Sequence, residues 1–202
     1  VVRGDFLRMQ LPRTPFKVVG NIPYSSTSAI VRKLVESANP PDDAWLVVQR
    51  ESGWRFCGRP YVEERPTSLW LKLGWHVEII QRFEPRDFDP PPKAESVLLW
   101  LSRRPRPLLN APETRWFREV VDATHRPSTQ AIDTAFRRWF SKRQLRRLAR
   151  DLRFDVGSSV GALTFEQWLG IVRFGTRHGR KRKPRRGGRD GNSGRGSAHR
   201  LS

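Results

Sequence analysis

The tetrapeptide Asn21-Ile22-Pro23-Tyr24 stands at the end of the apolar run Val18-Val19-Gly20, and a stretch of helical character, Ser25 to Glu36, follows it. In open α/β sheets, ligands bind in the crevice outside the carboxyl ends of the strands. An amide, a proline and an aromatic ring at such an end make a small polar mouth with one flat wall, which suits chemistry on a flat ring that carries an amine. Because Asn and Pro are also common in turns, an ordinary junction between a strand and a helix is the alternative interpretation.

The elements that would position this mouth alternate between strands and a helix. The run Ala44 to Gln49 is almost continuously apolar, which is typical of a strand buried on both faces of a sheet. A strand, a helix and a second strand, followed by a late pair of strands, predict a doubly wound α/β sheet that ends in a hairpin. The predicted strands are Phe16 to Gly20, Ala44 to Gln49, Gly74 to Phe83 and Ser96 to Ser102, and the proline-rich loop Glu84 to Glu95 joins the last two.

Beyond Arg106 the apolar residues recur at the three-to-four spacing of helices. Residues 105–175 are therefore predicted to form a small all-helical domain, distinct from the α/β part at 1–104. Thr164 and Gln167 have capping-box spacing, which marks the start of the last helix. The four helical stripes are Trp116, Phe117, Val120, Val121 and Thr124; Ile132, Ala135, Phe136, Trp139 and Phe140; Leu145, Leu148, Ala149 and Leu152; and Trp168, Leu169, Val172 and Arg173.

The third predicted helix carries a row of cations, with only Asp151 and Asp155 nearby to balance them. A charge run of this kind is usually a solvated helix face. The excess of positive charge favours a surface that faces nucleic-acid phosphates. The predicted RNA-binding residues are Lys142, Arg143, Arg146, Arg147 and Arg150, with Arg153 at the end of the row.

The last segment, 176–202, consists mainly of Gly, Arg and Ser, so it cannot bury a core and is predicted to be disordered. Between Arg177 and Arg200 it carries eight Arg and two Lys against the single acidic residue Asp190, a net charge of +9. The whole chain has a net charge of +19, and 32 of its 39 basic residues are Arg. Because Arg grips phosphate bidentately and stacks on bases, the charge predicts a polyanionic partner.

The cysteine, histidine and apolar content exclude several kinds of site and of protein. A single cysteine, Cys57, excludes an internal disulfide. The four histidines are scattered and show no zinc-ligand spacing, so no metal site is expected. No apolar run approaches the ~18 residues of a membrane span, and we expect a cytoplasmic monomer without a membrane partner. Because the chain begins at Val1 with what reads as the end of a strand and a loop, we expect a fragment whose first strands are missing.

A series of motifs resembles, in its order, the ribosomal RNA adenine N6-methyltransferases. The motifs are Gly4-Asp5-Phe6-Leu7, Asn21-Ile22-Pro23-Tyr24, Gln49-Arg50-Glu51 with Arg55, and Phe88-Asp89-Pro90-Pro91-Pro92 leading to Ser96. The segments Lys142 to Leu145 and Leu163 to Leu169 are similar to the helical domain of the Erm branch. That branch modifies one adenine of 23S ribosomal RNA and confers resistance to macrolide, lincosamide and streptogramin B antibiotics, whereas a housekeeping branch dimethylates two adjacent adenines of small-subunit RNA. The later segments and the Gly/Arg tail favour the resistance branch.

The resemblance implies a Rossmann-like class I methyltransferase sheet, S-adenosylmethionine as the methyl donor and 23S ribosomal RNA as the partner. It implies that Asp5 accepts a hydrogen bond from the adenine amine of the cofactor and that Phe6 lies against that ring. Asn21 is implied to stand where the cofactor and the target base meet. Tyr24 would stack on the flipped target adenine, and Phe88 would wall its other side.

Parts of the family pattern are absent from this sequence. The glycine-rich loop after the first strand and the acidic residue that ends the second strand would hold the methionine part and the ribose of the cofactor. We therefore expect the 202-residue chain alone not to methylate RNA. Ser52-Gly53-Trp54 stand where the family usually has small apolar residues, which leaves the secondary structure of residues 50–60 open.

The chemistry of an adenine amine explains the residue types in the mouth. The amine is a poor nucleophile because its lone pair is delocalised into the ring. The Asn21 amide oxygen and a backbone carbonyl, of Ile22 or Pro23, can accept its two hydrogens and favour a pyramidal nitrogen aimed at the methyl group. Positioning of this kind can supply up to ~7–11 kcal/mol. Because stacking needs only a ring, Tyr24→Phe is expected to keep much activity. The predicted catalytic residues are Asn21, Ile22, Pro23, Tyr24 and Phe88.

Two functions remain open at the level of the sequence. The first is the C-terminal part of a ribosomal RNA adenine N6-methyltransferase, and the second is a non-catalytic RNA-binding protein with the same helical domain and tail. A Glu/Asp-x-Gly-x-Gly segment upstream of Val1 would favour the enzyme. A DNA adenine methyltransferase is disfavoured, because those enzymes generally carry Asp-Pro-Pro-Tyr.

Overall fold

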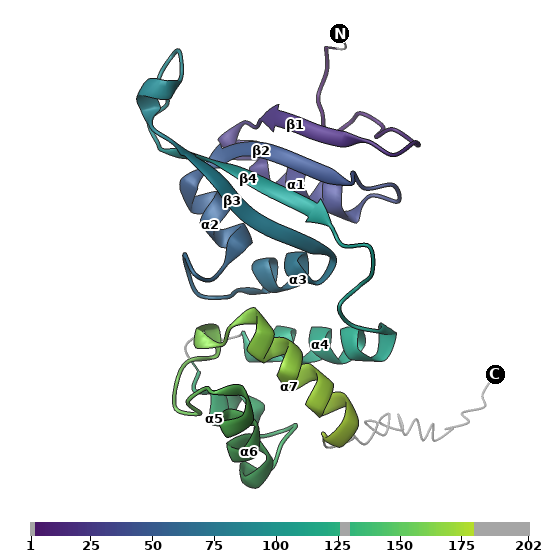
Figure 1. Ribbon diagram of the computed structural model, residues 1–202, viewed down its shortest axis with the longest axis vertical. Coiled ribbons are helices and arrows are strands. Elements are labelled where there is room, and N and C mark those ends of the chain that lie inside the picture. Colours follow the sequence, from purple (N-terminus) through teal and green to yellow (C-terminus); the bar gives the residue numbers. More distant parts are fainter. Residues whose placement is uncertain (1–2, 126–129, 180–202) are drawn as a thin grey trace, which may run out of the picture.

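The structure is a computed structural model, and it describes residues 3–125 and 130–179. A mixed sheet forms one part of the molecule and a group of helices forms the other (Figure 1). Most of the tail that is predicted to be disordered lies outside the described residues. Among the helices that are described, none combines the length and the apolar character that crossing a membrane requires.

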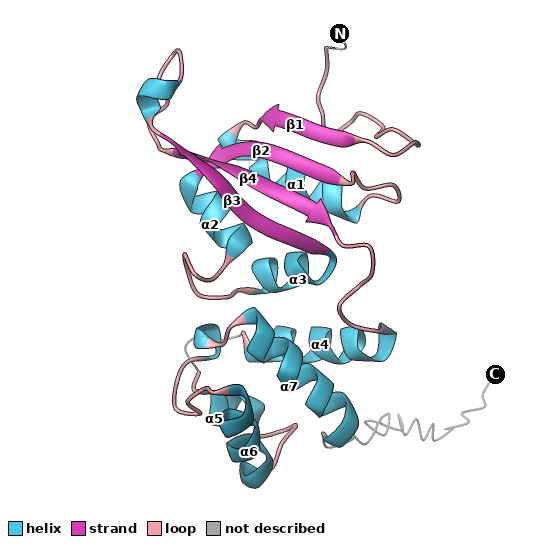
Figure 2. Cartoon of the chain, in the orientation of Figure 1, coloured by secondary structure: helices cyan, strands magenta, loops and turns pink. Residues whose placement is uncertain are grey.

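The sheet has four strands in the order β1-β2-β4-β3, drawn in magenta in Figure 2. β1 (Lys17–Asn21) is parallel to β2 (Asp43–Gln49), and helix α1 (Thr27–Glu36) connects them. β3 (Trp75–Phe83) and β4 (Ser96–Arg103) form an antiparallel hairpin, and β4 also pairs with β2. The predicted α/β sheet with a terminal hairpin is confirmed, and each strand end lies within one residue of its expected position.

β2 is fully buried on one face only, which corrects the expectation that both of its faces are covered. Ala44, Leu46 and Val48 are fully buried, whereas Trp45 and Val47 are partly exposed. The buried residues share a core with α1, and Figure 1 shows α1 and α2 on that one side of the sheet. The apolar content of a strand does not reveal whether helices cover one face or two.

Two helices lie between β2 and β3, where the sequence pattern gives no clear signal. α2 (Arg50–Cys57) begins directly after β2. A Cβ on Gly53 would lie 2.5 Å from Val97 Cγ2, so α2 approaches the sheet more closely than a larger residue allows. α3 (Pro66–Gly74) has proline at its first turn, a position where proline is favoured because that N–H has no partner in the helix.

The described residues after β4 form four α-helices: α4 (Ala111–Thr124), α5 (Ile132–Phe136), α6 (Lys142–Leu152) and α7 (Phe165–His178). The capping box at the start of α7 is confirmed, because the Gln167 N–H donates to Thr164 Oγ1 over 3.2 Å. These helices bury their own apolar core, to which α3 contributes Leu69 and Leu73. Leu71 of the same helix packs into the core of the sheet, so α3 joins the two parts.

Two helix ends differ from the predicted stripes. α5 ends at Phe136, and Trp139 and Phe140 lie beyond it. Both rings still reach the core, because the Phe140 N–H donates to the Phe136 carbonyl over 3.1 Å and preserves the local helical spacing. At the other end, α7 continues to His178, beyond the predicted boundary at 175, and Gln144 Nε2 donates to the His178 carbonyl there.

Candidate functional site

A mouth forms where the end of β1 meets the proline-rich loop between β3 and β4. Asn21 is the last residue of β1, and the Ile22 N–H continues the ladder by donating to the Val47 carbonyl over 3.0 Å. All five residues of the predicted catalytic set line one cavity of about 440 Å³ here. The lining residues are Asn21, Ile22, Pro23, Tyr24, Phe88, Asp89, Pro90 and Pro92.

The backbone of the mouth offers one carbonyl rather than two. The Pro23 carbonyl already accepts hydrogen bonds from the Ser26 N–H at 3.0 Å and from Thr27 Oγ1 at 3.3 Å. Both bonds belong to the start of α1, which is therefore tied to the mouth. The Asn21 side chain is exposed, whereas that of Ile22 is buried. The Asn21 amide and the Ile22 carbonyl are thus the acceptors available to a ligand amine.

The two aromatic walls are each supported by a residue of the sheet. The half-buried Tyr24 places its hydroxyl oxygen 2.7 Å from Ser96 Oγ. Phe88 packs edge-on against Phe83, with ring centroids 5.7 Å apart. The sequence analysis assigns Ser96 and Phe83 no role; the available signal for Ser96 is a polar residue directly before the apolar run 97–101 of β4.

Asp5 and Phe6, the predicted cofactor-binding residues, do not line this cavity. Asp5 Oδ1 accepts the Leu7 N–H over 2.9 Å, and the Phe6 ring lies 5.4 Å from the Lys33 ammonium. Lys33 also donates to the Phe6 carbonyl over 2.8 Å, so α1 holds this segment in place. An accessible carboxylate beside an aromatic ring fits the chemistry of an adenine ring, and the assignment of these residues to the cofactor stays a prediction.

The five predicted RNA-binding cations lie on the exposed side of α6, while Leu145 and Leu148 occupy its buried side. Arg147 is paired with Asp151, with Nε and Oδ2 3.6 Å apart. The other four have no ion-pair partner in the part of the chain that the structure describes, and they are Lys142, Arg143, Arg146 and Arg150. This surface, the α6 cation face, is therefore positively charged and open to solvent.

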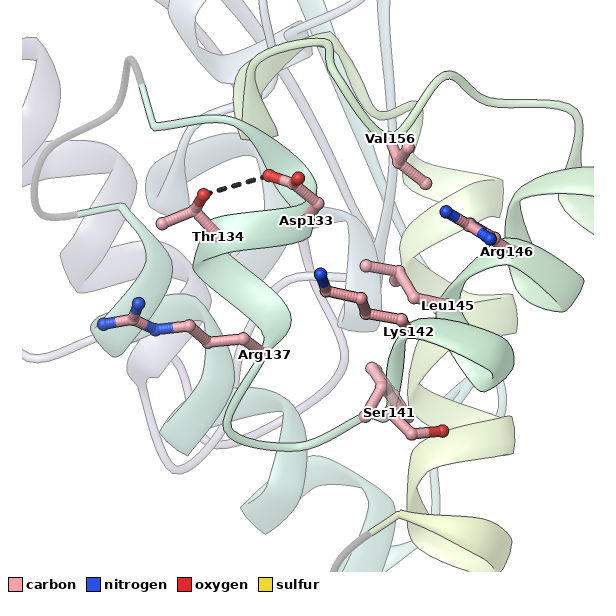
Figure 3. Close-up of a pocket in the computed structure, with 9 residues that line it drawn as sticks. Asp133, Thr134, Arg137, Ser141, Lys142, Leu145, Arg146 and Val156 are labelled. Carbon is pink, nitrogen blue, oxygen red and sulfur yellow. Dashed lines mark hydrogen bonds between the residues drawn. The ribbon is translucent and has the colours of Figure 1, made fainter.

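Several hollows border the α6 cation face, and Lys142 and Arg146 line two of them. Figure 3 shows the first, of about 450 Å³, with the Lys142 ammonium directed into the space beside Asp133 and Thr134. The Thr134 hydroxyl donates to Asp133 Oδ1 over 3.0 Å. A second hollow is lined by Lys142, Arg143, Arg146 and Arg150. Because they line both hollows, Lys142 and Arg146 are accessible to a ligand in either one.

The mouth and the α6 cation face lie far apart, since α6 stands at the end of the molecule away from β1 (Figure 1).

Cys57 belongs to neither site. Its burial raises the pKa of the thiol to about 12, so it is protonated at neutral pH and unsuited to act as a nucleophile. Besides the side chain of Asp89, the mouth offers hydrogen bonding by Asn21 and Ile22 and two aromatic rings for stacking.

Comparisons with known proteins identify several ribosomal RNA methyltransferases that are similar to this chain. Residues 1–176 match the family model described as ribosomal RNA adenine dimethylase. An rRNA methyltransferase of Streptomyces thermotolerans is 33% identical over 181 residues, which cover 89% of this chain and 59% of that protein. A ribosomal RNA small subunit methyltransferase A of Synechococcus sp. (strain JA-3-3Ab) is 29% identical over 176 residues, which cover 85% of this chain and 63% of that protein.

A solved structure with the same architecture is that of the 23S rRNA methyltransferase ErmE. The two chains have a TM-score of 0.78 and are 27% identical, and the match covers 85% of this chain and 70% of that one. The present chain spans about three fifths of the length of the curated relatives named above. The Rossmann-like fold that the sequence predicts, with helices in the C-terminal part, is confirmed by this likeness.

Proposed function

Because the chain belongs to the ribosomal RNA adenine dimethylase family, we propose that the protein transfers methyl groups from S-adenosylmethionine to the N6 amine of an adenine in 23S ribosomal RNA. The observation that carries this proposal is the mouth, where Asn21, Tyr24 and Phe88 line one cavity. The modification would give resistance to macrolide, lincosamide and streptogramin B antibiotics. The likeness to ErmE supports the choice of 23S ribosomal RNA.

In this mechanism the chain's own groups orient the reacting amine. The Asn21 amide oxygen accepts one amine hydrogen, and the Ile22 carbonyl accepts the other, because the Pro23 carbonyl is already engaged at the start of α1. With both hydrogens held, the nitrogen lone pair is directed out of conjugation with the ring. A strong base is not required, since the amine proton can leave to water through the open mouth after the methyl has been transferred.

The cofactor and the target base would meet at Asn21. S-adenosylmethionine supplies the electrophilic methyl group when bound, and Asp5 and Phe6 would hold its adenine ring. Tyr24 and Phe88 would flank the flipped target adenine. Stacking on an aromatic ring contributes about 1–3 kcal/mol per base, which offsets the cost of taking the base out of the RNA stack.

The α6 cation face would hold RNA phosphates at a distance from the mouth. Lys142, Arg143, Arg146 and Arg150 are free of ion pairs among the described residues, so no protein contact has to be broken before they bind. Each phosphate that they neutralise releases counterions and makes binding more dependent on salt. Arg147 would contribute less, because Asp151 competes for its guanidinium.

The substrate can be tested with the complete gene product that carries this chain. It would be expressed in a macrolide-sensitive bacterium that lacks its own small-subunit adenine dimethyltransferase, and the nucleosides of purified 23S and 16S ribosomal RNA would be measured by mass spectrometry. We expect N6-methylated adenine in 23S ribosomal RNA together with growth on erythromycin. The absence of new methylated adenine from both RNAs would contradict the proposal.

Methylated adenine confined to 16S ribosomal RNA would favour the housekeeping function instead. The similarity to a ribosomal RNA small subunit methyltransferase A is the observation that keeps this second function under consideration. A protein that binds ribosomal RNA but transfers no methyl group would correspond to the non-catalytic alternative.

A further inference from the structure

Ser96 carries a hydroxyl into a buried position beside the mouth. It is the first residue of β4 and only 1% exposed, and Val97 after it is fully buried. A buried hydroxyl is unfavourable unless it is hydrogen-bonded. Its partner is the phenolic hydroxyl of Tyr24, at an Oη–Oγ distance of 2.7 Å that is normal for a bond between two hydroxyls.

Ser96 is fixed on both sides by the sheet. Its backbone lies opposite Gln49 in β2 and Phe83 in β3, and together these three residues form one rung across the sheet. Immediately before it, the Glu95 carbonyl accepts the Arg50 N–H over 2.9 Å, and the side chains of Glu95 and Arg50 form an ion pair. The Ser96 hydroxyl is therefore a rigid point of attachment.

The same rung supports both aromatic walls of the mouth. Ser96 bonds to Tyr24 from one position, and Phe83 packs edge-on against Phe88 from the neighbouring position. Strand pairing therefore holds the residues that support the two rings, although Phe88 itself belongs to the loop between β3 and β4.

We propose, on the basis of the function proposed above, that Ser96 is a positioning residue for Tyr24. Its hydrogen bond fixes the direction in which the ring on which the target adenine stacks points from the backbone. Without this bond only the longer contact of the Tyr24 hydroxyl with the Ala94 carbonyl, at 3.5 Å, holds the end of the ring. The ring can then swing about its first side-chain torsion, and part of the stacking energy is spent on ordering it when a base binds. Tyr24→Phe keeps the ring but loses its hydrogen bond to Ser96. This variant should therefore bind the target base more weakly, and keep less activity, than the stacking argument from the sequence alone predicts.

The test measures the binding of a base to the complete gene product with 2-aminopurine riboside monophosphate, whose fluorescence falls when it stacks on an aromatic ring. The quantity compared is the concentration of protein that gives half of the maximal quenching. Ser96→Ala and Tyr24→Phe should each raise the half-saturating concentration by about two- to ten-fold, the effect of one lost hydrogen bond. The double variant should lose no more than either single variant. Ser96→Thr, which keeps the hydroxyl, should restore the wild-type value.

Two matched controls separate this role from general stability. Ser52→Ala removes a hydroxyl from another buried serine, and Tyr61→Phe removes one from the second tyrosine of the chain, whose ring stacks on Trp54. Both should leave the half-saturating concentration unchanged. A purely structural role of Ser96 would lower the melting temperature without changing this concentration.

The outcomes distinguish the positioning role from the function on which it rests. If the wild type quenches the probe and both Ser96→Ala and Tyr24→Phe do so equally well, the positioning role is wrong and the proposed function stands. A double variant whose loss equals the product of the two single losses would also overturn it, because the two hydroxyls would then act independently. If the wild type does not quench the probe, the mouth does not stack a base, and both proposals fail.

Discussion

Replacing Lys72 by methionine breaks a buried ion pair between helix α3 and the segment directly before it. The Lys72 ammonium lies 2.5 Å from Glu64 Oε1, with the two side chains 13% and 1% exposed. Glu64 also accepts the Ser68 hydroxyl at 2.6 Å and the Arg59 N–H at 3.3 Å. The ammonium further lies 5.7 Å from the ring centroid of Phe165, the first residue of α7. Lys72 therefore holds a buried carboxylate and contacts the start of the last helix.

The size of the effect follows from the charge that remains. Lys72→Met leaves the Glu64 carboxylate with only the two neutral donors just named, and removal of one partner from a buried ion pair costs about 3–5 kcal/mol. In a chain of this size each kcal/mol lowers the melting temperature by about 2–4 °C. We therefore expect the variant to melt about 6–20 °C below the wild type.

Thermal unfolding followed by circular dichroism measures this shift. Arg147→Met is the matched control, because it breaks an exposed ion pair that is expected to contribute at most about 1 kcal/mol. The double variant Glu64→Leu/Lys72→Met removes both charges and should be more stable than Lys72→Met alone. If Lys72→Met melted at the same temperature as the Arg147→Met control, the reasoning would be refuted.

Three further predictions follow from the charged and titratable groups. Arg146→Gln should flatten the dependence of log K on log salt for RNA binding by about 0.7–0.9, the contribution of one phosphate contact. Arg147→Gln should change this slope less, because Asp151 already pairs with that residue. Equal effects of the two variants in filter-binding titrations would count against the difference. A chain that stops at Gly179, just after α7, should bind RNA more weakly at low salt but keep its choice of adenine, because every residue that lines the mouth is retained. Methylation of a different adenine would disprove this. Burial lowers the pKa of His125, so the folded protein takes up a proton less readily than the unfolded chain, and stability should fall as the pH is lowered below the unfolded value of ~6.5. His125→Phe should reduce this pH dependence of the melting temperature, and an identical dependence in both proteins would contradict it.

Local sequence signals are enough to predict the strands. The apolar runs that become β1, β2 and β4 are bounded by polar or proline-containing segments, and their ends are correct to within one residue. The capping box at Thr164 likewise marks the start of α7, because its hydrogen bonds connect residues only three positions apart. Such features depend on neighbours along the chain, which is why they can be recognised without a structure.

Features that depend on distant contacts could not be predicted in the same way. The need for a glycine at position 53 of α2 becomes clear only from the close approach of Val97, which lies in strand β4, far away in the sequence. The ion pair of Glu64 with Lys72 follows no helical or strand spacing, and a carboxylate in a polar sequence gives no sign that it is buried. Tertiary packing, rather than local propensity, determines these positions.

The meeting of Tyr24 and Phe88 in the mouth was predictable only through the family resemblance. Tyr24 and Phe88 are far apart in sequence, and no periodicity connects them, yet they line the same cavity. The contact of Tyr24 with Ser96 joins the start of α1 to the start of β4, and it depends on the order of the strands. Residue types indicate which chemistry is possible, but the sheet determines which residues meet.

The central claim is that Asn21 orients an adenine amine for methyl transfer. The most direct test measures the transfer of tritium from labelled S-adenosylmethionine to 23S ribosomal RNA by the complete gene product and by its Asn21→Ala variant, with RNA affinity determined in parallel. The account predicts transfer by the wild type and its loss in Asn21→Ala at unchanged RNA affinity, because the amide acts on the reacting amine and not on the phosphates. Transfer by Asn21→Ala at the wild-type rate would contradict the account.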